Sequence, residues 1–200
     1  CTKYTLPFRP LHQSFHGFKI AHLSDFHNCK FGNVTAHICQ SLRTEKPDII
    51  VITGDLIDSR NPNVAIALAF VGELTTIAPC YYVPGNHEAR LYFSSHFSRL
   101  LNGLKRFGVE ILRNRNVCLT KQEETITIAG VDDPLFTKKL NGRYEPLKLE
   151  TINQFVTEDA FSILLSHRPE YFTLYKHSRA NLVFSGHAHG GQFRIPFIGG

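Results

Sequence analysis

The fold of this chain is decided by the run Ile49-Ile50-Val51-Ile52, which leads into Thr53-Gly54-Asp55-Leu56-Ile57-Asp58. A short, wholly apolar run, without the polar alternation of a half-exposed strand, is typical of a strand buried on both faces. The segment Lys46-Pro47-Asp48 separates this strand from the residues before it. Because strands of this kind occur mainly in parallel sheets covered by helices, the run predicts an α/β fold.

The same order of strand, polar loop and helix recurs on both sides of this run. In layered folds of this kind, ligands bind outside the carboxyl ends of the strands. No internal repeat or linker interrupts the pattern, so we expect a single domain over residues 1–200, with residues 1–17 irregular or forming an edge strand. The predicted strands are residues 18–23, 80–83, 110–112, 161–165 and 181–184, the predicted helices are residues 34–45, 64–75, 96–107 and 152–158, and residues 117–119 and 124–129 form a more purely β section.

The composition indicates a globular chain with a sizeable core, since 42% of the 200 residues are hydrophobic and 20% are charged. The net charge of +5 is compatible with an anionic substrate, but the basic residues are scattered and identify no nucleic-acid partner. Eleven histidines favour metal binding. The five cysteines form no Cys-x-x-Cys pair, and we expect them to be small buried hydrophobes in a reducing setting.

The two ends of the chain indicate a piece of a longer protein. It begins with Cys1, contains no methionine and stops at Gly199-Gly200. Neither a signal peptide nor an apolar run of the roughly 18 residues that a membrane helix needs is present. We therefore expect a soluble fragment of a cytoplasmic or membrane-associated parent chain, whose anchor would lie in a segment absent here.

Polar side chains with metal-binding atoms follow five of the predicted strands. Taken singly, each has an ordinary explanation: an Asp-x-His turn can cap a helix, Gly-Asp and Asn-His occur in turns, and a lone histidine after a strand is often only hydrogen-bonded. Nothing structural, however, requires all five strands to end this way. The residues are Asp25 and His27, Asp55, Asn86 and His87, His167, and finally His187 and His189.

The number of these donors exceeds the three or four protein ligands of a single catalytic zinc ion. It suits two divalent ions about 3.5 to 4 Å apart, bridged by a carboxylate, which is an arrangement used to cleave phosphate esters. Oxygen and nitrogen donors without a thiolate favour manganese, iron or zinc over magnesium or copper(I). The sequence therefore predicts a binuclear metal centre.

Five ordered motifs carry a family resemblance that covers residues 25 to 189. Together they resemble the calcineurin-like metallophosphoesterases. The sequence around His167 and His187 is similar to that of the small, often membrane-anchored bacterial members. The resemblance implies a four-layer α/β/β/α sandwich, and further strands are expected after His189, so the chain would be truncated there. The motifs are Asp25-Phe26-His27, Gly54-Asp55-Leu56-Ile57-Asp58, Gly85-Asn86-His87-Glu88, His167 and Gly186-His187-Ala188-His189.

The resemblance also implies a role for each motif residue. One ion would be held by Asp25, His27 and His189, the other by Asn86, His167 and His187, and Asp55 would bridge the two. A hydroxide between the ions would attack phosphorus in line. His87 would not be a ligand; it would face the leaving-group oxygen, where it could donate a proton or stabilise negative charge. Asp58 would orient His87, although an aspartate there could also merely cap the turn.

Other polar residues receive no role in the predicted centre. Glu88 is expected to brace its loop, and the remaining histidines are expected to be ordinary core or surface residues. Arginines suit phosphate oxygens, but the sequence gives no geometry to choose among the candidates. The residues set aside are His22, His37, His96, His177, Arg90, Arg168, Asp132 and Asp133.

Three functions follow from these residues. The first is an enzyme that hydrolyses a phosphomonoester or, slightly favoured because no long insertion covers the site, a phosphodiester of modest size. The second is a catalytically silent scaffold with the same fold, which the intact ligand set disfavours. The third is a nuclease, for which the positive charge is permissive but no basic stripe is present.

Overall fold

The computed structural model describes residues 2–9, 11–29, 33–137 and 139–189. In its first sheet the run Ile49-Ile50-Val51-Ile52 lies in β2, an inner strand whose five residues are all buried. All neighbouring strands of this sheet are parallel, with Ile20 opposite Ile49 and Ile50 opposite Cys80. The strand order is β1 (Ile20–Leu23), β2 (Ile49–Thr53), β3 (Cys80–Val83) and β4 (Glu110–Ile111).

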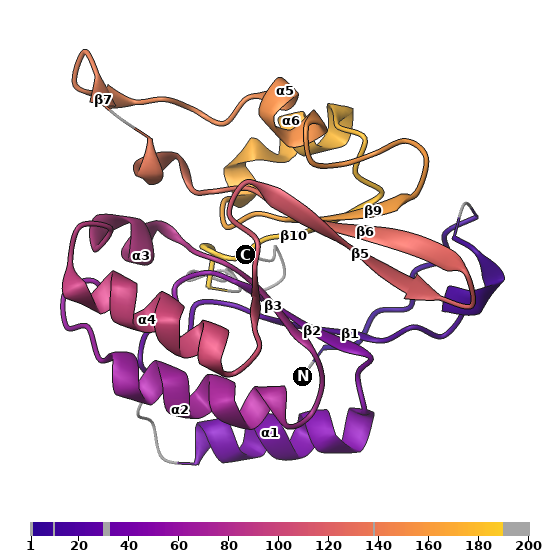
Figure 1. The fold of residues 1–200 in the computed structure, drawn as a ribbon, viewed down its shortest axis with the longest axis horizontal. Helices are drawn as coiled ribbons and strands as arrows, with labels where there is room; N and C mark the ends of the chain where they lie inside the picture. Colours follow the sequence, from indigo (N-terminus) through magenta and orange to yellow (C-terminus); the bar gives the residue numbers. More distant parts are fainter. Residues whose placement is uncertain (1, 10, 30–32, 138, 190–200) are drawn as a thin grey trace, which may run out of the picture.

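Three helices cover the outer face of the first sheet (Figure 1). They are α1 (Val34–Glu45), α2 (Val64–Thr75) and α4 (Ser95–Arg106), close to the predicted ranges. α2 begins where the Asn63 side chain accepts a hydrogen bond from the Ile66 N–H, and α1 ends at Lys46, whose backbone is left-handed. Their apolar faces and the sheet form one core cluster that contains Leu42, Ile52, Val71 and Leu100.

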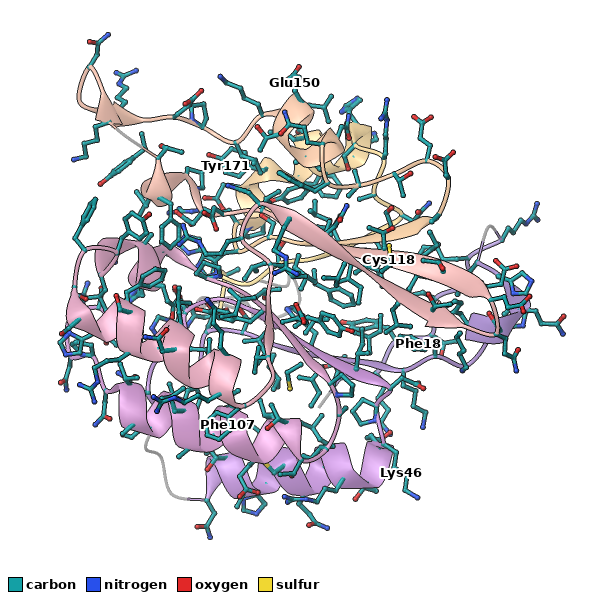
Figure 2. The ribbon with its side chains drawn as sticks, viewed as in Figure 1. Phe18, Lys46, Phe107, Cys118, Glu150 and Tyr171 are labelled. Atoms are coloured by element: carbon teal, nitrogen blue, oxygen red, sulfur yellow. The ribbon has the colours of Figure 1, made fainter. Side chains whose placement is uncertain are left out.

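The second sheet has the order β10-β9-β6-β5. β5 (Arg115–Lys121) and β6 (Glu124–Gly130) form an antiparallel hairpin, whereas β9 (Phe161–Leu165) pairs in parallel with β6 and with β10 (Leu182–Phe184). α5 (Leu149–Asn153) and α6 (Phe172–His177) lie on its outer face (Figure 1). A second core cluster joins the inner faces of both sheets, and side chains fill the space between them (Figure 2). The predicted four-layer α/β/β/α sandwich is thereby confirmed.

Several local predictions were wrong. The helix predicted over residues 152–158 is α5, which ends at Asn153, because the chain turns there and the Thr157 N–H bonds to the Ser162 side chain at the start of β9. For residues 2–9 and 11–17 the irregular alternative is confirmed, since they contain a short 3-10 helix, η1 (Gln13–Phe15), and no strand. Cys118 is exposed on β5, although Cys39 and Cys80 are buried as expected.

Several short helices and strands were not predicted from the sequence. The predicted turn after β3 begins the helix α3 (Asn86–Arg90), and α6 follows the short helix η3 (Pro169–Tyr171). The segment after β6 contains η2 (Pro134–Phe136) and a small hairpin of β7 (Lys139–Leu140) and β8 (Arg143–Tyr144). Among the described residues, no helix is long and apolar enough to span a membrane.

Candidate metal centre

The carboxyl ends of five strands converge at one edge of the sandwich, and there they bring the predicted ligands together. β1 leads to Asp25 and His27, β2 to Asp55, and β3 to Asn86 at the start of α3. From the second sheet, β9 leads to His167, and β10 leads to His187 and His189. The centre therefore lies between the two sheets and takes side chains from both.

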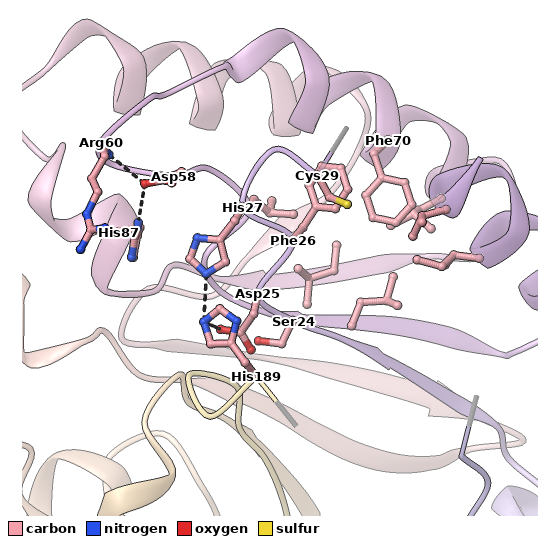
Figure 3. A pocket seen from close by; sticks show the side chains of 16 residues that line it. Ser24, Asp25, Phe26, His27, Cys29, Asp58, Arg60, Phe70, His87 and His189 are labelled. Atoms are coloured by element: carbon pink, nitrogen blue, oxygen red, sulfur yellow. Dashed lines mark hydrogen bonds and ion pairs between the residues drawn. The ribbon is translucent and has the colours of Figure 1, made fainter. Parts of the chain in front are cut away.

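The first group of possible ligands consists of Asp25, His27 and His189. The Nε2 atoms of the two histidines are 3.3 Å apart, and their rings stack with centroids 4.8 Å apart. His189 Nε2 lies 3.9 Å from Asp25 Oδ1. Figure 3 shows the three side chains facing one another. One ligand atom of each residue lies within 4.8 Å of those of the others, which is the spacing that one ion requires.

The second group consists of Asp55, His167 and His187, with Asn86 beside them. His167 Nε2 is 2.9 Å from Asn86 Oδ1 and 3.2 Å from His187 Nδ1. The other ring nitrogen of His167, Nδ1, lies 2.7 Å from the Thr53 carbonyl oxygen, which fixes the orientation of the ring. These groupings are those that the family resemblance implies; that they hold ions stays a prediction.

Asp55 links the two groups through a single carboxylate oxygen. Its Oδ2 atom lies 3.6 Å from His27 Nε2 and 3.3 Å from His167 Nε2. Burial alone would raise the pKa of Asp55, but the hydrogen bond and positive charge of His167 outweigh it and hold that pKa below its ordinary value. Burial alone would lower the pKa of His167, but Asp55 raises it to about 9. In the metal-free protein these two residues are therefore an ion pair.

The backbone is strained at this edge of the sandwich. Five of the seven predicted ligands are non-glycine residues with a positive φ: Asp25 at 57°, His27 at 47°, Asp55 at 53°, His187 at 66° and His189 at 51°. Left-handed backbone costs such residues on the order of 1–3 kcal/mol each, and it persists where the surroundings or function demand it. Its concentration here indicates that the loops are shaped to aim side chains rather than to minimise local energy.

Two glycines allow the loops to approach closely. A Cβ atom on Gly85 would lie 2.3 Å from Asp55 Oδ1, so any other residue would displace the carboxylate. A Cβ atom on Gly186 would lie 1.8 Å from Ser24 Oγ, in the loop after β1. These positions let β3 approach β2, and let the second sheet approach the first, at the distance that the centre needs.

Glu88 braces the centre without facing it. Its side chain is fully buried, and its two oxygens accept hydrogen bonds from the backbone N–H groups of Asp55, Ile57 and Gly85 at 2.8, 3.0 and 2.8 Å. Burial and the nearby charge of Asp55 raise the pKa of Glu88 to about 7, while the three N–H donors oppose that rise. Glu88 thus ties the loop after β2 to the loop after β3, as its motif position predicted.

His87 lies beside the first group, with its ring centroid 4.5 Å from that of His27. Its Nδ1 atom accepts a hydrogen bond from the Ser59 N–H at 2.9 Å and lies 3.3 Å from Asp58 Oδ1. Asp58 Oδ1 also accepts the Arg60 N–H at 2.8 Å, so Asp58 both caps its own turn and neighbours His87. The sequence did not predict the contact between Ser59 and His87, because the donor is a backbone N–H, which nearly every residue has.

Three of the charged residues set aside in the sequence, Arg168, Asp132 and Asp133, occupy two ion pairs, the second of them with Arg113. Arg168 Nε is 2.6 Å from Asp133 Oδ2, and Arg113 Nη2 is 2.7 Å from Asp132 Oδ2. Arg168 also reaches the centre, since its Nη1 atom lies 3.4 Å from His187 Nε2. Burial, followed by the charge of Arg168, lowers the pKa of His187.

Two cavities adjoin the centre. The larger, of about 560 Å³, passes from Asp25, His27, His87 and His189 to the apolar side chains of α1 and α2 (Figure 3). The smaller, of about 450 Å³, is polar and is lined by Asp55, Asn86, His87, His187, Ala188 and His189, together with Arg60 and Arg90. Both have the size of pockets that take small molecules.

Comparison with known proteins agrees with this geometry. A transmembrane protein with a metallophosphoesterase domain from Bos taurus is 32% identical over 201 residues, covering 96% of this chain and 44% of that protein. The metallophosphoesterase YkuE of Bacillus subtilis is 29% identical over 205 residues, covering 99% of this chain and 67% of that protein. The chain spans less than half the length of the Bos taurus relative and of a similar protein from Danio rerio.

Solved structures show the same fold. The protein TT1561 of Thermus thermophilus matches with a TM-score of 0.59 at 16% identity, covering 83% of this chain and 80% of that chain. Phosphopantetheinyl hydrolase from Mycobacterium tuberculosis matches with a TM-score of 0.55 at 17% identity, covering 86% and 83%. The family model described as calcineurin-like phosphoesterase matches residues 18–191, which is most of the sequence. The chain belongs to the calcineurin-like phosphoesterase family.

Proposed function

We propose that this chain is a phosphoesterase that uses two divalent metal ions to hydrolyse a phosphodiester or phosphomonoester by in-line attack of water. The observation that carries this proposal is the position of Asp55, whose Oδ2 atom faces His27 of one ligand group and His167 of the other. A carboxylate oxygen shared by two donor groups is the arrangement of a two-metal site for phosphate ester cleavage.

The residues present fit such ions. In the first group His27 and His189 direct ring nitrogens at each other, and in the second group His167 and His187 do the same. Burial lowers the pKa of His27, although Asp55 opposes this, so its neutral ring can offer a lone pair to a cation. Nitrogen and oxygen donors without sulfur suit manganese, iron or zinc. We propose that Asp25, His27 and His189 hold one ion, that Asn86, His167 and His187 hold the other, and that Asp55 bridges them.

When bound, the ions polarise the phosphoryl oxygens and lower the pKa of water, so that a nucleophile is available near neutral pH. The side chains of the protein then act on the leaving group. Because Nδ1 of His87 accepts the Ser59 N–H, the neutral ring carries its proton on Nε2. That N–H can donate a hydrogen bond to the departing oxygen and stabilise its negative charge. The carboxylate of Asp58 lies 3.3 Å from the same Nδ1 atom and can accept a hydrogen bond from it only when the ring is protonated on both nitrogens.

The test is the variant Asp55→Ala, compared with the wild-type protein for metal content and for hydrolysis of 4-nitrophenyl phosphate and bis(4-nitrophenyl) phosphate. We expect wild-type protein to bind two ions per chain and to turn over at least one ester, and the variant to lose both properties together. Activity with a full metal complement in the variant would contradict the bridging role. A wild-type protein that binds two ions but hydrolyses neither ester would support the silent scaffold instead.

A further inference from the structure

We propose that Arg60 and Arg90 bind a second phosphate next to the one that is attacked, so that the substrate is a diester of diphosphoric acid. This inference rests on the proposed function and narrows it to one class of phosphate ester. It comes from two guanidinium groups at the centre that the rest of the described protein leaves without a carboxylate partner.

The first observation is the position of the two arginines. Both line the polar cavity of about 450 Å³ together with Asp55, Asn86 and His87. Arg60 also lines the larger cavity, and Figure 3 shows its guanidinium beside the ring of His87. Both side chains are exposed, so they can reach a ligand in this cavity without breaking the protein core.

The second observation is that neither arginine forms an ion pair among the described residues, although the charge of Asp58 interacts with that of Arg60 at longer range. Five other arginines form ion pairs with Asp or Glu: Arg43, Arg113, Arg115, Arg168 and Arg179. Within residues 2–9, 11–29, 33–137 and 139–189, no ion pair involves Arg60 or Arg90. Arg168, although near His187, is paired with Asp133 and Glu170. A planar guanidinium that forms no ion pair and lines a polar cavity is suited to phosphate oxygens.

The balance of charge favours a dianion. Two divalent ions would carry four positive charges, and Asp25, Asp55 and Asp58 supply three negative ones at the two cavities. The attacking hydroxide adds a fourth negative charge, so the two arginines leave this region with two positive charges. A simple phosphodiester carries one negative charge and a phosphomonoester carries up to two on a single phosphate, whereas a diphosphate diester carries one charge on each of two neighbouring phosphates. The second charge therefore gives the arginines a partner that a simple diester lacks.

The arginines lie on the leaving-group side of the centre. Arg90 follows His87 by three residues on α3, and residues three apart share a helix face. Arg60 follows Asp58, and its N–H bonds to the carboxylate oxygen that neighbours His87 Nδ1. Since the proposed function places His87 at the departing oxygen, the second phosphate would be part of the leaving group.

The reaction balances with water as the only co-reactant. A bond forms between the attacked phosphorus and the oxygen of water, and the bond from that phosphorus to the bridging oxygen breaks. The bridging oxygen leaves with the second phosphorus, so both products are phosphate monoesters, and the protons of the water are shared between them or released. Arg60 and Arg90 would stabilise the charge that builds up on the departing phosphate.

The kinetic test compares the double variant Arg60→Ala/Arg90→Ala with the wild-type protein, both loaded with manganese. The substrates are a dinucleoside diphosphate, which is a diphosphate diester, and bis(4-nitrophenyl) phosphate. Removing charge-assisted hydrogen bonds of about 1.5–3 kcal/mol corresponds to a tenfold to hundredfold loss. We expect kcat/KM for the diphosphate diester to fall by this factor, and kcat/KM for the monophosphate diester to fall much less. Arg99→Ala/Arg106→Ala, which removes two exposed arginines of α4 that form no ion pair within the described part of the chain, is the matched control and should behave as wild type.

Calorimetric binding provides a readout that does not depend on turnover. The ligands are a methylene-bridged diphosphonate diester, which cannot be hydrolysed at the bridge, and dimethyl phosphate. We expect the wild-type protein to bind the diphosphonate at least tenfold more tightly, on the order of one or two charge-assisted hydrogen bonds, and the double variant to lose that preference. Arg60→Lys/Arg90→Lys should recover part of it, because charge returns without the two-pronged geometry.

The outcomes separate the two proposals. Turnover of bis(4-nitrophenyl) phosphate by the wild-type protein, without any preference for the diphosphate ligand, would overturn the role of Arg60 and Arg90 while leaving the phosphoesterase intact. A preference that survives in the double variant would overturn it as well. Failure to hydrolyse any ester with both ions bound would instead contradict the proposed function. Metal content and circular dichroism of each variant verify that the centre and the fold are retained.

Discussion

The two sheets contribute different chemistry to the same centre. The loops after β1, β2 and β3 supply both carboxylates, the amide of Asn86 and one imidazole, whereas the loops after β9 and β10 supply only imidazoles. Neither of the two proposed ligand groups lies on one sheet alone. Asp25 and His27 need His189 from the second sheet, and Asp55 needs His167 and His187. The proposed binuclear centre therefore requires the two sheets to pack together, although three possible ligands, His27, Asp55 and His87, lie on the first sheet alone.

The proposed ligands also differ in exposure: His189, from the second sheet, is the exposed one, whereas His167 of the same sheet is fully buried. Asp55 and Asn86 are 1% and 3% exposed and lie around the buried brace of Glu88, while the His189 side chain is 36% exposed. His187 is tied to the first sheet by its N–H, which bonds to Asp25 Oδ1 at 3.0 Å. The first sheet thus supplies a prebuilt half-site, and the histidines after β10 complete it from the other side.

The largest effects are expected when one ligand is removed from each side. Asp25→Asn, which keeps the shape of the side chain, should lose the first ion, and His187→Ala should lose the second. Each variant should retain the other ion, because Asp55 still serves it. Loss of several kcal/mol of metal stabilisation corresponds to about a thousandfold drop in kcat. Metal analysis and kinetics on one preparation check both points; loss of both ions in either variant would show that the groups do not load separately.

The next effect concerns His87, which comes from the first sheet but is assigned to the leaving group rather than to an ion. His87→Ala should keep both ions and lose about a hundredfold to ten-thousandfold in rate, as expected for general acid–base groups. The loss should be greatest for esters with poor leaving groups. His177→Ala, on the exposed end of α6, is the control. A variant without its ions would instead make His87 a ligand, since His27, Asp55 and His87 are also close enough to share one.

A smaller effect, on the free energy of unfolding, is expected from changing Glu88, whose side chain braces the loops after β2 and β3. Glu88→Gln leaves one oxygen where two accept three backbone N–H groups, so at least one buried donor loses its partner. An unsatisfied buried donor costs about 1–3 kcal/mol, and urea unfolding should show a loss of that size. Glu73→Gln, which disrupts an exposed ion pair with Arg43, should cost under about 1 kcal/mol. Equal losses in the two variants would remove the reason to call the first sheet prebuilt.

The smallest effect is the release of protons when ions bind. In the metal-free protein the pKa of His167 is raised to about 9, mainly because Asp55 outweighs the opposing effect of burial. At pH 7.5 the ring is therefore protonated, and a cation must displace about one proton to bind Nε2. Affinity should rise with pH up to pH 9 and then level off. Calorimetry in two buffers of different ionisation enthalpy counts the proton, and identical heats would contradict the ion pair.

Local patterns were enough to predict most of the fold. The runs of β2, β3 and β9 are apolar without alternation, and the ranges of α1 and α2 match the predicted helices. The short helices α3 and α6 were missed because helices of five or six residues are unstable on their own and depend on tertiary contacts. The helix predicted up to residue 158 ends at Asn153 for a similar reason, since a contact with Ser162 turns the chain.

The sequence by itself determined which residues could form the centre, because metal-binding side chains follow buried strands and parallel strands end at one edge. Only the tertiary structure decided how they are used. It placed Asp55 between two groups, put the Ser59 N–H on His87 and left Arg60 and Arg90 without carboxylate partners among the described residues. These facts depend on distances between loops that are far apart in the sequence. Such distances are set by the packing of the two sheets, which no local pattern encodes.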